Sequence, residues 1–346
     1  MKRTIGAFAI SCILYVHSPA QTNVGTSITD TSDTREFSLG SIRIEGEVEN
    51  PEVVQFSSLP SRGVAVKELA LDEAGKRHFK GAFLFSGYSL YDILKTAKVK
   101  KANEKEFGPP IDLYVVIQND VGQKALVSWG EVFYAKNRFQ ILISRSVEAI
   151  NPTKLKTRWA LPSNPQLICG DDLDDVRFIP NPNKIIMRSF SGSIRSSKSE
   201  DIYSPEITVV NGSDSVRVSQ FGPAVRQRSY KSVGYGHGRG FKGVHEMGGF
   251  VLKDVLSDEV KPNLQDLRAS ILVVSAKDGY RTVFSVSEIF NRNDNQDCVL
   301  VDEKDSRTDG RYLLFVPSDF FADRNVKAVE RIEMENPDSL RQDNPQ

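Results

Sequence analysis

The sequence of 346 residues predicts two tandem α+β domains, each with a mixed, mostly-β core and short helices. The first reason is a repeat: residues 79–94 read FKGAFLFSGYSLYDIL, and residues 241–256 read FKGVHEMGGFVLKDVL. A second matched block follows each copy, at residues 115–133 and 273–290. The third reason is that β-branched apolar runs outnumber helical patterns, which are short. Because the period is close to one domain, we expect a tandem of related domains and not a solenoid.

The first block matches without a gap. Its recurring residues are one Phe, one Lys, two Gly, two Leu and one Asp, namely Phe79, Lys80, Gly81, Gly87, Leu90, Asp92 and Leu94 against Phe241, Lys242, Gly243, Gly249, Leu252, Asp254 and Leu256. The second block matches Val-Val, Asp, Gly, Ser, Glu and Phe once one residue is skipped. Two matched blocks in the same order indicate a duplication.

The N-terminus has the features of a secretory signal peptide. Lys2 and Arg3 form a basic start, residues 4–17 are an apolar run, and residues 18–20 (Ser-Pro-Ala) form a small-residue cleavage site. We therefore predict a signal peptide over residues 1–20 and an exported, periplasmic or secreted, mature chain. A buried N-terminal helix and lipidation at Cys12 are the alternatives.

Composition excludes a global attraction to nucleic acid or to an anionic membrane, since Lys plus Arg and Asp plus Glu number 45 each. We predict no nucleic-acid partner and no transmembrane segment in the mature chain. Two cysteines remain after export, Cys169 and Cys298, at non-equivalent positions of the two repeats. Two buried residues in strands are favoured over one long-range disulfide bridge.

The first domain is predicted over residues 41–188, after a flexible leader over residues 21–40. Short strands are expected at residues 42–44 and 53–56, a short helix at 90–96 and a buried strand at 114–117. Residues 127–133 run from a strand into a helix, for which Ser128 and Glu131 form a capping box.

The second domain is predicted over residues 205–335, after a linker over 189–204 and before a disordered tail over 336–346. Its expected elements correspond in order: strands at 207–210, 216–218 and 271–275, a helix at 252–256, and a strand-to-helix segment at 284–290. Ser285 and Glu288 are placed to cap that last helix. For both Ser–Glu pairs the alternative to capping is a catalytic role.

The second repeat resembles the molybdopterin-binding domain of the sulfite oxidase family. The resemblance rests on Asp278-Gly279-Tyr280 leading into residues 283–288, on residues 310–319 and on the closing segment 322–333. It covers residues 205–335. The first repeat is similar over residues 41–188 but more diverged.

The resemblance implies an α+β domain that cradles a pterin-dithiolene holding molybdenum, with one Cys thiolate on the metal. In active members this Cys lies upstream of the motif that corresponds to residues 87–94 and 249–256. The matching stretches, residues 64–85 and 225–247, contain no Cys. The resemblance therefore implies a scaffold that has lost its metal ligand.

A basic, Gly-rich segment at residues 235–245 is the first candidate site. Its His237, Arg239, Lys242 and His245 can donate to an anion, such as a pterin phosphate, because Gly-rich backbone allows close approach. An ordinary polar, turn-rich loop is the alternative, and a zinc site is disfavoured because no third ligand is near.

The resemblance adds Arg311, Arg324 and Lys327, which match basic positions of the family's closing motifs and could face a cofactor phosphate. Their rough counterparts in the first repeat are Arg177 and Lys184. A solvated basic edge is the alternative. A nearby acidic cluster is read as an exposed turn, with weak calcium binding as the alternative: Asp171, Asp172, Asp174 and Asp175.

We therefore expect an exported, non-redox binding module for a small anionic ligand or a partner protein, and not an enzyme. A molybdopterin-dependent oxidoreductase without a Cys ligand is the alternative, with molybdopterin as its cofactor. That alternative requires Arg239, Arg311 and Arg324 to converge on one pocket. A third hypothesis is an interaction surface built on dimer-like packing of the two repeats.

Overall fold

A computed structural model describes residues 33–152, 158–194, 203–304 and 310–338. The predicted signal peptide lies outside these residues. So do parts of the predicted leader, linker and tail. The observed strand β1 (Thr34–Glu36) falls within the predicted leader, and the buried Phe190 falls within the predicted linker.

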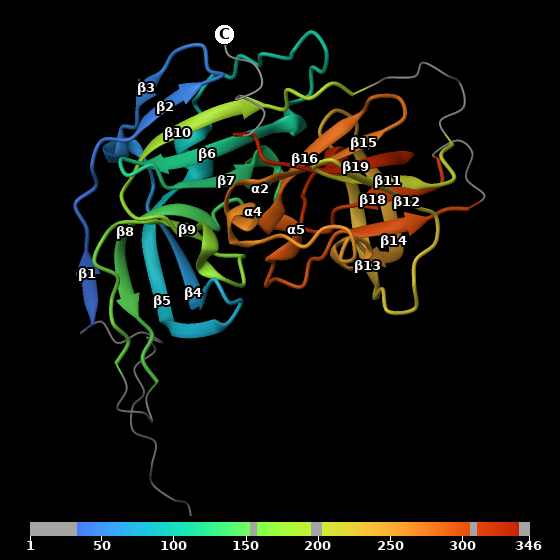
Figure 1. Cartoon of the computed structure of the whole chain (residues 1–346). Coiled ribbons are helices and arrows are strands. Elements are labelled where there is room, and N and C mark those ends of the chain that lie inside the picture. The colour runs from blue at the N-terminus through green and yellow to red at the C-terminus, as the bar shows by residue number, and fades with distance from the viewer. Residues whose placement is uncertain (1–32, 153–157, 195–202, 305–309, 339–346) are drawn as a thin grey trace, which may run out of the picture.

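The chain is mostly β, with about 45% of the described residues in strands and 13% in helices. Four small sheets are set like the blades of a four-bladed β-propeller (Figure 1). The predicted α+β fold class is therefore wrong. The physical reason is that the helices have only four to six residues, so they cap strand ends and cannot cover a sheet as a helical layer.

The first half of the chain supplies two sheets. One has the order β1-β8-β5-β4 with β9 on β8, formed by β1, β4 (Arg62–Leu71), β5 (Arg77–Ser89), β8 (Ile141–Ala149) and β9 (Leu167–Cys169). The other has the order β3-β2-β10-β6-β7, formed by β2 (Arg43–Gly46), β3 (Glu52–Val53), β6 (Leu113–Asn119), β7 (Lys124–Ser128) and β10 (Pro182–Ser189). The helices of the first half are α1 (Leu90–Leu94), α2 (Trp129–Phe133), η1 (Phe56–Ser58), η2 (Pro110–Asp112) and η3 (Asp175–Arg177).

The second half supplies the other two sheets. One has the order β13-β14-β17-β18, formed by β13 (Gln227–Gly236), β14 (Gly240–Val251), β17 (Val299–Asp302) and β18 (Tyr312–Phe315). The other has the order β12-β11-β19-β15-β16, formed by β11 (Ile207–Asn211), β12 (Asp214–Val218), β15 (Ile271–Ala276), β16 (Arg281–Ser285) and β19 (Val329–Glu335). The helices of the second half are α3 (Leu252–Val255), α4 (Leu264–Ala269), α5 (Val286–Phe290) and η4 (Ala322–Arg324).

Apart from β1, which has no counterpart among the described residues of the second half, the two halves have the same strand order, including one parallel pair each, β2 with β10 and β11 with β19. The strand register also corrects the sequence match of the second block. Tyr114 pairs with Ser128 and Ile271 with Ser285, and the equivalence continues along both strand pairs at constant spacing. No residue has to be skipped. The predicted domain boundaries stay a prediction.

The residues that recur in the first block have a common structural explanation. Gly87 and Gly249 lie where the next strand comes so close that a Cβ atom would collide with a backbone carbonyl. Asp92 and Asp254 each bind an arginine at the start of the preceding hairpin, with Nε–Oδ2 distances of 2.8 Å to Arg62 and 2.6 Å to Arg226. Each copy of the motif therefore anchors a β-hairpin to the helix that follows it.

Each half has its own apolar core, and a third cluster joins them. The joining cluster takes side chains from β6 and β7 of the first half and from β15 and β16 of the second: Tyr114, Val116, Leu126, Ile271, Val273 and Val283, together with Phe190. In Figure 1 the short helices α2, α4 and α5 lie between the halves. The interface between the halves, which we call the seam, is thus buried in the middle of the molecule.

Candidate functional site

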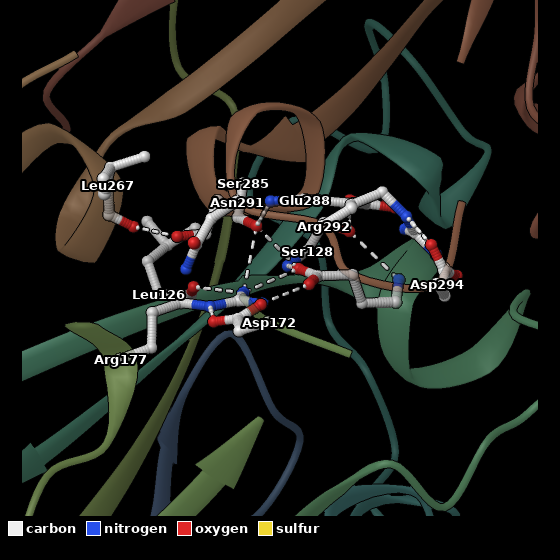
Figure 2. Close-up of polar contacts among 12 residues, drawn as sticks. Leu126, Ser128, Asp172, Arg177, Leu267, Ser285, Glu288, Asn291, Arg292 and Asp294 are labelled. Atoms are coloured by element: carbon white, nitrogen blue, oxygen red, sulfur yellow. Dashed lines mark hydrogen bonds and ion pairs between the residues drawn. The ribbon is translucent and has the colours of Figure 1, made fainter. Parts of the chain in front are cut away.

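The polar part of the seam is a reciprocal network built on the two helix caps. Ser128 Oγ donates to Glu288 Oε2 at 2.7 Å, and Ser285 Oγ donates to Glu131 Oε2 at 2.8 Å. The predicted capping box of Ser128 and Glu131 is confirmed. Ser285 also caps its helix, but the Glu288 side chain is directed across the seam instead (Figure 2). The same two residue types thus cap their own helix and contact the other half.

Two buried arginines neutralise the carboxylates of this network. Arg177 makes a bidentate pair with Asp172, at 2.8 and 2.6 Å (Figure 2). It also contacts Glu131 at 2.8 Å. Arg324 makes the equivalent pair with Asp319, at 2.7 and 2.6 Å, and contacts Glu288 at 2.6 Å.

Each guanidinium also reaches across the seam. Arg177 donates to Ser285 Oγ at 3.0 Å, and Arg324 donates to Ser128 Oγ at 3.3 Å. The rough correspondence of Arg177 to Arg324 seen in the sequence is an equivalence in the structure.

Backbone contacts repeat the reciprocity. The amide of Leu173 donates to the carbonyl of Asn291 at 2.6 Å, and the amide of Phe320 donates to the carbonyl of Tyr134 at 2.7 Å. The halves are therefore related by an approximate twofold arrangement of contacts, as in an isologous dimer.

The two glutamates have opposite pKa shifts. Burial alone would raise the pKa of Glu131, but Arg177 and the donated Ser128 N–H and Ser285 hydroxyl outweigh it, so this pKa is lowered. Burial raises the pKa of Glu288, and Arg324 offsets only part of the effect. Glu131 is therefore the more firmly ionised carboxylate of the pair.

The network holds the halves together and has no reactive group. Both serine hydroxyls donate to carboxylates, and the described histidines contact other residues: His78 pairs with Asp72 at 2.9 Å, and His245 contacts the Lys242 carbonyl at 3.1 Å. A serine needs an adjacent base to become a nucleophile, and a paired glutamate does not supply one here. The catalytic alternative for these Ser–Glu pairs has no support.

A small cavity of about 20 Å³ lies beside the network. It has room for about one water molecule and for no organic ligand. Its lining includes Cys169, Asp171 and Arg292. Burial and the neighbouring Asp294 carboxylate raise the pKa of Asp171 to about 6. This cavity brings acidic groups of both halves close together.

The acidic cluster of the first half is not the exposed turn that the sequence predicted. Asp172 and Asp174 are buried, and each holds an arginine: Asp172 binds Arg177, and Asp174 binds Arg77 at 2.8 Å. Among the residues that the structure describes, no group of three metal-ligating side chains occurs.

The Gly-rich segment at residues 235–245 is not a loop. It forms the turn and the adjoining strand ends of a hairpin of β13 and β14, which we call the arm (residues 227–251). His237 lies in the turn, where its N–H donates to Asp323 Oδ2 at 3.0 Å and its ring meets Phe321 edge-on with centroids 5.4 Å apart. Arg239, Lys242 and His245 are exposed on the arm. The four residues proposed for this segment are thus distributed over the turn of the arm and β14.

The arginines that the oxidoreductase alternative required do not converge. Arg324 is buried in the seam, whereas Arg311 binds Asp302 at 2.9 Å and the carbonyls of Pro205 and Ser219. Arg239 is exposed on the arm. Lys327 is exposed beside η4. Two of the three guanidinium groups are therefore already engaged by protein acceptors.

The cysteines do not fit a metal centre either. Cys169 and Cys298 are buried and unpaired, as predicted. Burial raises the pKa of Cys169 well above its usual range and that of Cys298 to about 12. Cys169 lines the cavity of about 20 Å³, which has no room for a pterin, and Cys298 is buried directly before β17. The residues present therefore do not fit a molybdenum-bearing pterin.

Sequence reasoning missed the apolar character of the arm. Val233, Tyr235, Phe241 and Val244 are 59, 40, 68 and 57% exposed, and Phe320 beside the arm's turn is 48% exposed. They form cross-strand pairs, Val233 with Val244 and Tyr235 with Phe241. The alternation of these residues with polar ones was a strand signal, but the many glycines between them indicated a loop.

Comparisons with known proteins do not place this chain. No protein-family model matches it, and no curated protein matches it. None of the helices in the described part of the chain is long and apolar enough to span a membrane.

Proposed function

We propose that this protein is a non-catalytic binding module that engages a partner protein through its arm. The observation that carries the proposal is the set of large exposed apolar side chains on the two-stranded hairpin at the edge of its sheet. Val233, Phe241 and Val244 are each more than half exposed. Contiguous exposed apolar side chains on a folded protein mark interaction sites.

The charges of the arm specify the kind of partner. Arg228, Lys231, Arg239 and Lys242 are exposed, and no ion pair joins them to a carboxylate among the described residues. Glu246 is the acidic residue of the same strands. A basic surface with apolar side chains at its centre favours a partner whose surface is acidic around an apolar patch.

A partner protein is favoured over a small anionic ligand. A small anion needs donors that converge, whereas the arm spreads its cations along two strands and separates them with apolar side chains. The predicted signal peptide places this interaction outside the cytoplasm.

Site-specific photocrosslinking tests the proposal. A benzoylphenylalanine at position 241 or 233 is expected to form an adduct in the native host, because these side chains face the partner. The same group at Val121, which is 80% exposed in the turn between β6 and β7, serves as the control and is expected to form none.

The adduct must then be reproduced with pure components. The partner identified from it is expected to bind the purified chain, and the Phe241→Ser variant roughly tenfold or more weakly, as for an interface anchor. Equal crosslinking at position 121, or unchanged binding of the variant, would refute the proposal. Stoichiometric molybdenum or pterin in the purified chain would favour the oxidoreductase instead.

A further inference from the structure

In the first half, other residues of the same half contact the repeated motif Phe-Lys-Gly, and Phe79 is 52% exposed. Phe79 packs edge-on against Trp159, with ring centroids 5.2 Å apart. Lys80 binds the carboxylates of Glu68 and Asp175. A Cβ atom on Gly81 would collide with Trp159. The chain itself thus supplies an aromatic ring and two carboxylates to this motif.

The corresponding contacts are not found among the described residues of the second half. Phe241 is 68% exposed, compared with 52% for Phe79. No ion pair to Lys242 is found among the described residues. A Cβ atom added to Gly243 would have only the ring of His245 within 4 Å, with its Nε2 atom at 3.3 Å. The second copy therefore keeps the recognition residues but lacks what they recognise in the first copy.

The strand edges differ in the same way. β8 pairs with β5 from Phe83 to Ser89, and the amide of Ile150 extends this contact by donating to the carbonyl of Ala82 at 2.8 Å. β17 pairs with β14 only at Phe250 and Val251. Within the described residues, β14 pairs over the rest of its length with β13 alone.

The register identifies the backbone groups on this open edge. The amide of Val251 donates to Arg226 of the β13 side, and that of Leu252 donates to Cys298 of the β17 side. Because this direction alternates along a strand, the N–H and C=O groups of Val244, Glu246 and Gly248 point to the open edge. Where β17 leaves β14, a hollow of about 350 Å³ is lined by Gly248, Gly249 and Asp302, among others.

The cause is a shorter connection in the second half. Residues 150–166 join β8 to β9 and carry Trp159, whereas residues 303–311 join β17 to β18. Among its described residues, the second half has no segment that pairs with β14 beyond Phe250 and Val251 on this side. Within the described residues no segment supplies an equivalent strand and ring, so this edge is available to another chain.

We infer that the open edge of β14 accepts an extended segment of the partner protein as an added antiparallel strand. The segment carries an aromatic side chain that packs over Gly243 against Phe241, and Asp or Glu residues that pair with Lys242. This is strand addition, in which main-chain hydrogen bonds give affinity and side chains give specificity. The inference rests on the proposed function and names the partner's binding element.

A second copy of this chain is not the occupant. The arm carries four exposed cations, Arg228, Lys231, Arg239 and Lys242, against the single carboxylate of Glu246, so two arms placed edge to edge would bring surfaces of like net charge together. An acidic strand has the opposite effect. The charge of the arm therefore selects the occupant.

A peptide selection tests the inference. A phage-displayed library of random dodecapeptides is selected on the immobilised full chain, and the selected peptides are synthesised for fluorescence anisotropy. We expect alternating β-branched sequences that contain an aromatic residue and Asp or Glu. A Lys242→Glu variant is expected to bind these acidic peptides roughly tenfold more weakly.

Two matched proline variants locate the edge. Val233 and Val244 are directly opposite each other, and their N–H groups point to opposite outer edges of the arm. Val244→Pro removes a donor from the open β14 edge, so we expect roughly tenfold weaker binding. Val233→Pro removes a donor from the β13 edge and should bind as the wild type does. Circular dichroism checks that both variants fold.

The outcomes separate the two proposals. If both proline variants bind as the wild type does while Phe241→Ser binds weakly, strand addition is refuted and the arm remains a binding site. If Val233→Pro alone weakens binding, the strand adds to β13, which also refutes the inference. A wild-type dimer that Val244→Pro dissociates in light scattering would make a second copy the occupant and overturn the choice of partner.

Discussion

At the scale of single residues, the seam depends on arginines whose charge is fully enclosed. Arg177 and Arg324 are each among the largest fully buried side chains of the described residues. Isolated charges are very costly to bury, and here two carboxylates and one serine hydroxyl surround each guanidinium. Loss of one partner would leave the others buried without compensation.

A substitution at Gly130 would test how tightly the seam encloses the Arg324 guanidinium. A Cβ atom at this position in α2 would collide with the Arg324 guanidinium, which Asp319 and Glu288 hold in place. Gly130→Ala is therefore expected to destabilise the protein by about 2–4 kcal/mol, through displacement of a buried ion pair. In an ordinary helix the same change would stabilise by roughly 0.5–1 kcal/mol, so the sign of the effect is decisive.

Urea unfolding followed by circular dichroism measures this difference. Ser287→Ala, at the equivalent position of α5, is the matched control. It loses one hydrogen bond, from Ser287 Oγ to the Leu267 carbonyl, and is expected to cost about 1 kcal/mol. A Gly130→Ala variant as stable as the wild type would show that Arg324 moves aside freely.

At the scale of elements, the same hairpin has two environments. β4 and β5 form a sheet with β8 and are tied down by Arg77 with Asp174. β13 and β14 form the arm, whose contacts near the turn are with Phe321 and Asp323. Local stability follows such contacts.

Hydrogen exchange of the full chain should show this difference directly. Glu246 and Gly248 on β14 are equivalent to Leu84 and Ser86 on β5, which pair with Glu148 and Ser146 of β8. We expect the β14 amides to exchange roughly 100-fold faster or more, since their edge is open. Binding of a selected peptide should slow them. Equal protection of both sets without a peptide would argue that another segment already covers the arm.

The elements also show what the sequence could predict. The capped helices at 129–133 and 286–290 were predictable, because a serine three residues before a glutamate is a local signal. The arm was not predictable, because its glycines weaken a strand pattern. Its open edge is recognised only by comparison with residues 150–166, which contact the equivalent hairpin of the first half. The direction of Glu288 across the seam depends on contacts between residues far apart in the chain, which periodicity does not record.

At the scale of the whole molecule, the duplication was predictable and the fold class was not. The repeated positions, such as Asp92 and Asp254, anchor equivalent hairpins, so they recur in the sequence. The fold class depends on how four sheets pack around short helices, and the resemblance to an α+β family was misleading on this point. The ion pairs of the candidate arginines, Arg311 with Asp302 and Arg324 with Asp319, could not be identified from the sequence, because each depends on the folded arrangement.

The seam also makes stability depend on pH. Asp171 of the first half lies near Asp294 of the second, and its pKa is raised to about 6 from an ordinary value of 3.8. A raised carboxyl pKa means that the folded state binds more protons than the unfolded state between these values. The contribution of Asp171 to the free energy of unfolding therefore falls as pH rises from about 4 to 6. Above pH 6 the full destabilisation by this carboxylate remains.

Asp171→Asn removes that cost. The variant is expected to be more stable than the wild type by about 1–3 kcal/mol at pH 7 and to lose this advantage near pH 4. Asp258→Asn, at an exposed position of the second half, is the control and should change stability little at either pH. Chemical unfolding at several pH values measures both. A pH-independent gain would mean that the carboxylate is not the cause.

The reciprocal seam suggests how such a chain can diversify. A half that meets a copy of itself through twofold contacts must accept every substitution twice, once in each subunit. Once the two copies are fused, each position can change alone. The shared contacts of Ser128 with Glu288 and of Ser285 with Glu131 then preserve the assembly, while one hairpin retains its cover and the other is free to acquire a new ligand.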